Sequence, residues 1–185
     1  MLRNSEQNFG LVSILIHWIM ALGVFGLFGL GLYMVELTYY DSWYQTAPYI
    51  HEGIGVLLAL LLLFRIGWRL ANPVPAFEPN MSSFEKFAAR AAHLGMYALI
   101  LAIVVSGYFI TTAKGDGLNV FDLFEVPAVI SKIDNLEDYA GEVHFFLAIL
   151  LIALTGVHSL AALKHHFINK DLTLVRILRP GSETD

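Results

Sequence analysis

Long apolar stretches separated by polar connections dominate this chain. The apolar stretches cover residues 11–37, 51–70, 87–112 and 143–165. Each is close to the roughly 20 residues that an α-helix needs to cross a hydrocarbon core of about 30 Å. Four segments that are this apolar are typical of a membrane protein rather than of a soluble domain. The pattern therefore predicts an all-α integral membrane protein, a four-helix bundle that forms one domain over residues 1–185.

Basic residues are unevenly distributed among the connections. Of the eleven Lys and Arg residues, only Lys114 and Lys132 lie on the side of the third connection, and the rest lie with the two termini and the second connection. Because cytoplasmic loops carry an excess of Lys and Arg, both termini are predicted to be cytoplasmic. The chain would then be a multi-pass membrane protein. Its short basic C-terminal tail fits contact with anionic lipid, and no nucleic-acid partner is expected.

Composition narrows the chemistry further. Hydrophobic residues make up 57% of the chain, charged residues make up 15%, and cysteine is absent. The absence of cysteine excludes disulfides, thiolate metal sites, iron–sulfur clusters and the covalent attachment of c-type haem. Residues 113–142 form the largest predicted extramembrane segment, and the alternating apolar positions in 120–124 predict contact with the outer membrane surface.

Histidines carry the candidate chemistry. Ionisable groups inside a membrane are costly, so those in the predicted helices are functional candidates. His144 and His158 are fourteen residues apart, which places them on one face of a helix and about 21 Å apart along its axis. His51 lies level with His144, and His17 lies level with His158. Because b-type haem iron takes a ligand on each side of the porphyrin, these pairs predict two haems b with bis-His ligation, which favours electron transfer over oxygen activation.

Three other histidines have different expected roles. His93 competes with His17 for the inner haem, but its place near the membrane interface favours contact with a haem propionate or a quinone. His165 and His166 follow Lys164 at the end of the predicted fourth helix. Cations are favoured at helix C-termini, so both are expected to be solvated. The arginines of the inner side, among them Arg65, are expected to extend to the interface, with pairing to haem propionates as the alternative.

Motifs around these histidines resemble the bacterial cytochrome b561 family of small di-haem inner-membrane cytochromes. The resemblance covers nearly the whole chain, and its motifs are Ile16-His17-Trp18, His51-Glu52-Gly53-Ile54-Gly55, Ala92-His93-Leu94-Gly95, Gly156-Val157-His158 and Ala161-Ala162-Leu163-Lys164-His165-His166-Phe167. It implies that His17 and His158 bind the inner haem and that His51 and His144 bind the outer one. It also implies ubiquinone or another membrane quinone as a partner, and some members oxidise periplasmic superoxide while reducing ubiquinone.

Charge on the outer side bears on the superoxide activity. Superoxide is an anion, and positive charge would speed its encounter with the protein. The predicted outer side instead holds ten acidic residues against Lys114 and Lys132. We therefore take Lys114, with Asp116 nearby, as the candidate for the outer substrate or quinone site.

Three classes of function remain open from the sequence. The first is an oxidoreductase that passes electrons between a quinone and a small outer substrate such as superoxide. The second is a quinol-fed electron-transfer subunit for a periplasmic redox or quinone-binding protein, with the acidic loop as its docking surface. The third is a non-redox membrane protein whose histidines bind a metal ion or protons; the paired depths of the four histidines argue against it.

Overall fold

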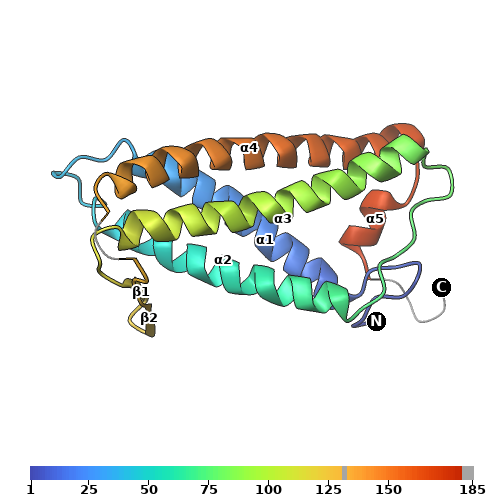
Figure 1. Ribbon diagram of the computed structural model, residues 1–185. Helices are drawn as coiled ribbons and strands as arrows, with labels where there is room; N and C mark the ends of the chain where they lie inside the picture. The colour runs from blue at the N-terminus through green and yellow to red at the C-terminus, as the bar shows by residue number, and fades with distance from the viewer. Residues whose placement is uncertain (131–132, 181–185) are drawn as a thin grey trace. The chain divides into compact units, whose positions relative to one another are not determined.

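Four long helices dominate the computed structural model, which describes residues 1–130 and 133–180. These helices are α1 (Leu11–Met34), α2 (Thr46–Leu70), α3 (Ser83–Thr112) and α4 (Leu136–Lys164) (Figure 1). A π-helical turn, η1 (His165–Asn169), continues α4, and a short helix, α5 (Thr173–Leu178), follows it. All four long helices are long and apolar enough to cross a membrane, which confirms the predicted all-α, four-helix membrane class.

Large apolar side chains cover the outer faces of these helices. Leu22 and Leu94 are each 71% exposed, and Leu160 is 66% exposed. A soluble protein rarely exposes so much contiguous apolar surface. In a bilayer these side chains contact lipid, and the helical backbone satisfies its own hydrogen bonds, as a membrane-spanning segment must.

Polar residues extend two helices beyond their predicted starts. α3 begins at Ser83 rather than at residue 87. The Ser82 hydroxyl accepts a hydrogen bond from the Glu85 amide at 3.2 Å, and the Glu85 carboxylate accepts one from the Ser82 amide at 2.9 Å. This reciprocal capping box satisfies two N–H groups that the first turn leaves unpaired. α2 begins at Thr46 rather than at residue 51, with Pro48 in the first turn, where a missing N–H costs no intrahelical bond.

The ends of α1 and α4 also differ from the prediction. α1 ends at Met34 instead of residue 37, because the Asp41 carboxylate accepts hydrogen bonds from the amide and hydroxyl of Thr38 and holds a turn there. α4 begins at Leu136 instead of residue 143. Its first turn contains Glu137 and Asp138, and acidic side chains are favoured near the positive end of the helix dipole.

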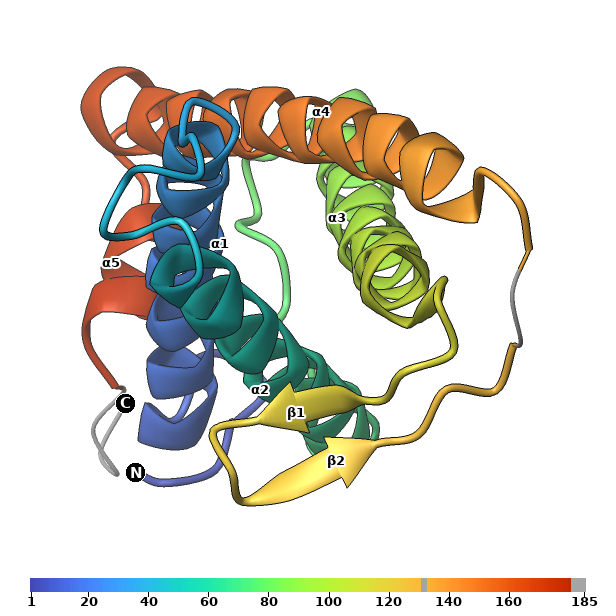
Figure 2. The same ribbon diagram turned by 90° about the vertical axis from the view of Figure 1, so that its left-hand side faces the viewer.

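A β-hairpin lies in the long connection, where the sequence did not predict strands. β1 (Leu118–Val120) pairs antiparallel with β2 (Phe124–Val126), and the two strands lie side by side in Figure 2. Phe121 and Asp122 make the reversal with φ values of 52° and 57°. Val120 is fully buried, whereas Leu123 is 77% exposed. Contact of this segment with the membrane surface stays a prediction.

The chain divides into two compact units, each containing part of every long helix. Unit 1 comprises Met1–Ala21, Leu61–Tyr97 and the chain from Ala153 onward. Unit 2 comprises Leu22–Leu60 and Ala98–Ile152. Each unit contains one of the predicted histidine pairs. The prediction of a single domain over residues 1–185 stays a prediction.

Candidate metal centres

In unit 2, α2 and α4 bring His51 and His144 together. Their ring centroids are 6.1 Å apart, and the ring planes are inclined at 63°. Two imidazoles that bind opposite sides of one metal, each through a metal–nitrogen bond of about 2 Å, hold their ring centres roughly 6 Å apart. The spacing of this pair therefore fits a single metal between the two rings.

Hydrogen bonds on α3 orient His144. Its Nδ1 lies 3.0 Å from the Ile103 carbonyl oxygen and 3.2 Å from Ser106 Oγ, and the Ser106 hydroxyl donates to the same carbonyl at 2.9 Å. A carbonyl oxygen can only accept, so Nδ1 carries the proton and donates to Ile103. The lone pair is then on Nε2. Histidines that bind metals commonly donate their other ring N–H to a carbonyl in this way, which fixes both tautomer and ring orientation.

Glycines leave room for the rings of this pair. A Cβ atom on Gly107 would lie 3.1 Å from His144 Cε1, and one on Gly31 would lie 3.4 Å from His51 Cε1. His51 Nδ1 is buried and has no hydrogen-bond partner in the described part of the chain. An unpaired buried nitrogen is costly. His51 Nδ1 is thus a ring nitrogen that no described residue pairs with and that a bound group could pair with.

In unit 1, three histidines gather from α1, α3 and α4. The His17 and His158 ring centroids are 6.3 Å apart, whereas those of His93 and His158 are 5.1 Å apart. The first distance matches the roughly 6 Å expected for two imidazoles on one metal, and the second is too short. Geometry therefore favours His17 over His93 as the partner of His158, and His93 packs beside the pair.

The donor set fits a haem better than a bare metal ion. Structural and catalytic ions such as Zn²⁺ are held by three or four protein ligands. Within residues 1–130 and 133–180, no group of three or more His, Cys, Asp or Glu residues could hold a metal ion. A porphyrin surrounds its iron with its own nitrogens and needs only axial ligands from the protein. Two histidines at each centre satisfy that need.

Arg65 of α2 lies in unit 1 without an acidic partner among the described residues. Its Nε donates to the Tyr97 hydroxyl at 2.9 Å, its Nη1 lies 3.6 Å from Met20 Sδ, and the guanidinium lies 5.5 Å from the centre of the Tyr97 ring. The side chain is partly buried and directed toward α1 and α3. A carboxylate such as a haem propionate would supply the missing opposite charge.

Lys114, the candidate residue of the outer substrate or quinone site, is ion-paired. Its Nζ lies 2.8 Å from Glu137 Oε2, and the lysine side chain is 72% exposed. The hydrogen bond to Glu137, together with the negative charges of Glu137, Asp116 and Asp138, raises the pKa of Lys114 above its ordinary value. Lys114 and Glu137 line an open cleft of about 320 Å³ between the end of α3 and the start of α4. The other predicted outer lysine, Lys132, lies outside the described residues.

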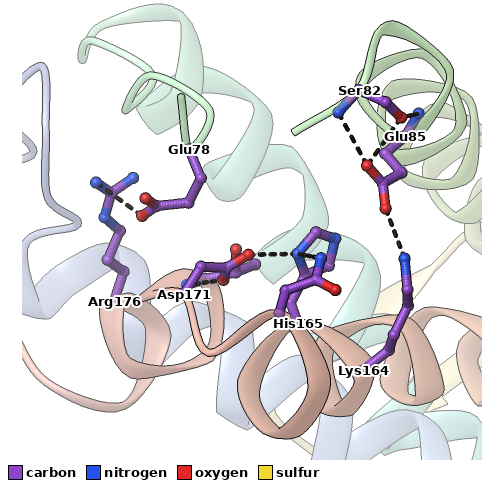
Figure 3. A network of polar contacts seen from close by, with 9 residues as sticks. Glu78, Ser82, Glu85, Lys164, His165, Asp171 and Arg176 are labelled. Carbon is purple, nitrogen blue, oxygen red and sulfur yellow. Dashed lines mark hydrogen bonds and ion pairs between the residues drawn. The ribbon is translucent and has the colours of Figure 1, made fainter. Parts of the chain in front are cut away.

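His165 differs from the prediction that it is solvated. It is only 5% exposed, and its Nδ1 lies 2.5 Å from Asp171 Oδ2 (Figure 3). The prediction was wrong because Lys170 adopts a left-handed conformation, with φ of 57°, that turns the chain back and brings Asp171 against η1. Nothing in the local sequence marks a lysine for that conformation. His166 is half-buried, and its ring lies 4.8 Å from that of Phe167.

Comparison with known proteins gives one consistent family. The family model described as prokaryotic cytochrome b561 matches residues 8–180. Cytochrome b561 homolog 2 of Escherichia coli is 45% identical over 97% of this chain and 95% of its own length. Probable superoxide oxidase CybB of Yersinia pestis is 29% identical over 94% of this chain and 97% of its own. Cytochrome b562 of Cereibacter sphaeroides is 28% identical over 95% and 98%.

These matches agree with the four apolar helices and with paired histidines suited to haem iron. The family implies haem b, electron transport and a place in the bacterial inner membrane. The chain therefore belongs to the prokaryotic cytochrome b561 family, as a multi-pass inner-membrane electron-transfer protein.

Proposed function

We propose that this protein binds two haems b and exchanges electrons with a membrane quinone. His51 and His144 would hold one haem, and His17 and His158 the other. The observation that carries the proposal is the pair of ring spacings, 6.1 Å and 6.3 Å, in two separate units. Both spacings suit one iron between two imidazoles, which need metal–nitrogen bonds of about 2 Å each.

The protein contributes ligation and orientation to this chemistry. Bound haem supplies a reversible one-electron change at iron. His144 would bind through Nε2 because its Nδ1 proton is committed to the Ile103 carbonyl at 3.0 Å. The two histidines of each centre would both hold the iron, which leaves no place there for an outside ligand. That arrangement supports electron transfer and disfavours oxygen binding.

The orientation of the chain is part of the proposal. The excess of Lys and Arg around the termini and the second connection supports a cytoplasmic location for both. The His17–His158 centre would then be the inner one, and the His51–His144 centre the outer one. Electrons would pass between them, with ubiquinone or another membrane quinone as donor or acceptor.

Superoxide is the candidate outer substrate. Support comes from the relative in Yersinia pestis that is named as a probable superoxide oxidase. Lys114 is the cation that would attract the anion. If it does, Lys114→Met should slow reduction of the haems by superoxide several-fold and leave reduction by ubiquinol unchanged. Equal superoxide rates in the variant and the parent protein would remove Lys114 from the site.

One observation favours a second candidate, a quinol-fed relay to a periplasmic partner protein. Lys114 is the only Lys or Arg of unit 2 among the described residues, and Glu137 already neutralises it. Around it, Asp116, Asp134 and Asp138 are exposed. Such an acidic surface would attract a basic protein and repel superoxide.

Anaerobic spectroscopy of the purified protein separates these functions. The oxidised protein is mixed with superoxide, or in parallel with ubiquinol, and the haem bands are followed. Reduction by superoxide followed by reoxidation with ubiquinone would establish a superoxide:quinone oxidoreductase. Reduction by ubiquinol alone would establish the relay. A protein without haem absorbance would refute both.

A further inference from the structure

A buried histidine–carboxylate pair lies at the junction of α4 and the C-terminal tail. The side chains of His165 and Asp171 are only 7% and 14% exposed, and His165 Nδ1 lies 2.5 Å from Asp171 Oδ2. The Asn169 side-chain amide lies 3.2 Å from the same ring nitrogen. Neither residue belongs to the centres formed by His17, His51, His144 and His158.

The charged groups around this pair are already engaged elsewhere. Lys164 is ion-paired with Glu85 of α3 at 2.6 Å, and Arg176 of α5 is ion-paired with Glu78 of the second connection at 3.0 Å; both pairs are drawn in Figure 3. Among the described residues, Asp171 is therefore the ionic partner of His165. The remaining titratable neighbours along the chain are His166, with its ring against Phe167, and Lys170.

The backbone is shaped to make this contact. η1 is a π-helical turn, a form that is rare and often found at functional sites. Lys170 then reverses the chain, and the Asp171 amide donates to the His165 carbonyl at 3.1 Å. The two carboxylate oxygens of Asp171 bind different groups. Oδ1 accepts a hydrogen bond from the Thr173 amide at 2.9 Å, and Oδ2 contacts the His165 ring. Asp171 thus both caps α5 and orients His165.

A carboxylate on Nδ1 determines what the rest of the ring can do. It holds the Nδ1 proton, so the lone pair of the neutral ring is on Nε2, and it stabilises the ring when Nε2 takes a proton. Histidines in this arrangement serve as general acids and bases in catalysis. The His165 side chain is buried but 7% exposed, so solvent reaches a small part of it.

His165 is also aligned with one of the proposed haem ligands. It is the first residue of η1 and follows His158 by seven residues, which in helical geometry amounts to about two turns and about 10 Å along the axis. Both residues therefore lie on the same face of the helix. Both also belong to unit 1.

We propose that His165, positioned by Asp171, is the proton-transfer group for the quinone reaction on the His158 side of the protein. This inference rests on the proposed exchange of electrons with quinone. A quinone that becomes quinol gains two electrons and two protons, one proton on each carbonyl oxygen. The reduced cytochrome supplies the electrons and is oxidised. His165 supplies the protons from Nε2 and is reprotonated from the aqueous phase, and the steps reverse when quinol is the donor.

The test compares an acceptor that needs protons with one that does not. Holoprotein is reduced, and reoxidation of its haem bands is followed after mixing with a short-chain ubiquinone or with ferricyanide, which takes an electron alone. Removal of general acid–base catalysis typically slows a reaction by about 10²–10⁴-fold. We expect His165→Gln to slow reoxidation by ubiquinone at least tenfold, with no change for ferricyanide and partial recovery in imidazole buffer.

Two further variants separate proton transfer from packing. His166→Gln is the matched control and should behave as the parent protein with both acceptors. Asp171→Asn retains an oxygen for the Thr173 amide but presents an N–H₂ group to His165, so it should also slow only the ubiquinone reaction. Equal ubiquinone rates in parent and His165→Gln would overturn the inference, as would equal slowing with both acceptors. A parent protein that does not react with ubiquinone would instead refute the proposed function.

Discussion

Where a histidine of the two pairs makes a hydrogen bond through Nδ1, that bond determines which ring nitrogen is free to bind a metal. His144 has its Nδ1 proton fixed by the Ile103 carbonyl, which directs Nε2 to the metal. His51 instead has a buried Nδ1 without a partner among the described residues. The two ligands of one proposed haem are thus held differently, and the His144 side is the more constrained.

Gly107 should be essential to the His144 position. A Cβ atom there would lie 3.1 Å from His144 Cε1, so the larger side chain of valine would force the ring to move. We expect Gly107→Val to lower the haem content of the purified protein by about half, as measured by pyridine haemochrome absorbance per chain. Gly55→Ala is the control, because no atom lies within 4 Å of its added Cβ. Full haem content in Gly107→Val would show that the space at Gly107 is not needed for haem binding by His144.

His17 and His93 should respond differently to the same substitution. Because 6.3 Å suits two imidazoles on one metal and 5.1 Å does not, His17→Gln should lose one haem and His93→Gln should retain both. Haem content and the low-temperature difference spectrum of each variant measure this. Loss of a haem in His93→Gln together with full content in His17→Gln would reverse the assignment.

Residue spacing predicted which histidine rings lie together, because a straight helix fixes both depth and face. His51 lies beside His144 and His17 beside His158 in the structure, whereas positions alone left His93 as a competitor of His17; the role of these pairs as haem ligands stays a prediction. The His165–Asp171 contact could not be predicted from positions, because it depends on the left-handed conformation of Lys170, and lysine rarely adopts it. The hairpin turn that begins at Phe121 was not predicted either, because Phe121 also adopts a left-handed conformation that its side chain does not favour.

Among the helices, apolar length predicted which segments exist, and polar caps decided where they begin. The apolar stretches mark the part of each helix that lies in lipid. α3 nevertheless starts at Ser83 and α4 at Leu136, where polar side chains extend the helix past the apolar stretch. Hydrophobicity cannot predict these extensions, because they depend on the Ser82–Glu85 capping box at α3 and on the acidic first turn of α4.

Ser82 should stabilise the start of α3. Its substitution by alanine removes the oxygen that accepts from the Glu85 amide at 3.2 Å. Loss of such a cap costs about 1 kcal/mol, which for a chain of this size corresponds to a fall in Tm of roughly 2–4 °C. Thermal unfolding of Ser82→Ala in detergent measures the effect. Ser83→Ala is the control, because the Ser83 hydroxyl bonds to no other described residue. Equal Tm values in the two variants would show that the Ser82 cap does not stabilise the start of α3.

For the whole molecule, both termini are predicted to lie on the cytoplasmic side of the membrane. Every long helix contributes to both compact units, and α4 supplies a histidine to each. Electron transfer along such a chain has a direction only if its two sides differ. The unequal distribution of Lys and Arg is the feature from which this orientation is predicted.

The absence of cysteine makes that orientation directly testable. Single cysteines at the exposed positions Asn80 and Asp116 would lie on opposite sides of the membrane. In intact spheroplasts, a membrane-impermeant maleimide should label Asp116→Cys and leave Asn80→Cys unlabelled until the cells are lysed. Labelling of Asn80→Cys before lysis would place the second connection, and with it the termini, outside.

The haem b content of the purified chain tests both histidine pairs at once, measured by pyridine haemochrome absorbance against protein determined by amino-acid analysis. Two bis-His centres predict two haems b per chain. One haem per chain, or none, would mean that one or both of the histidine pairs have a role other than haem binding.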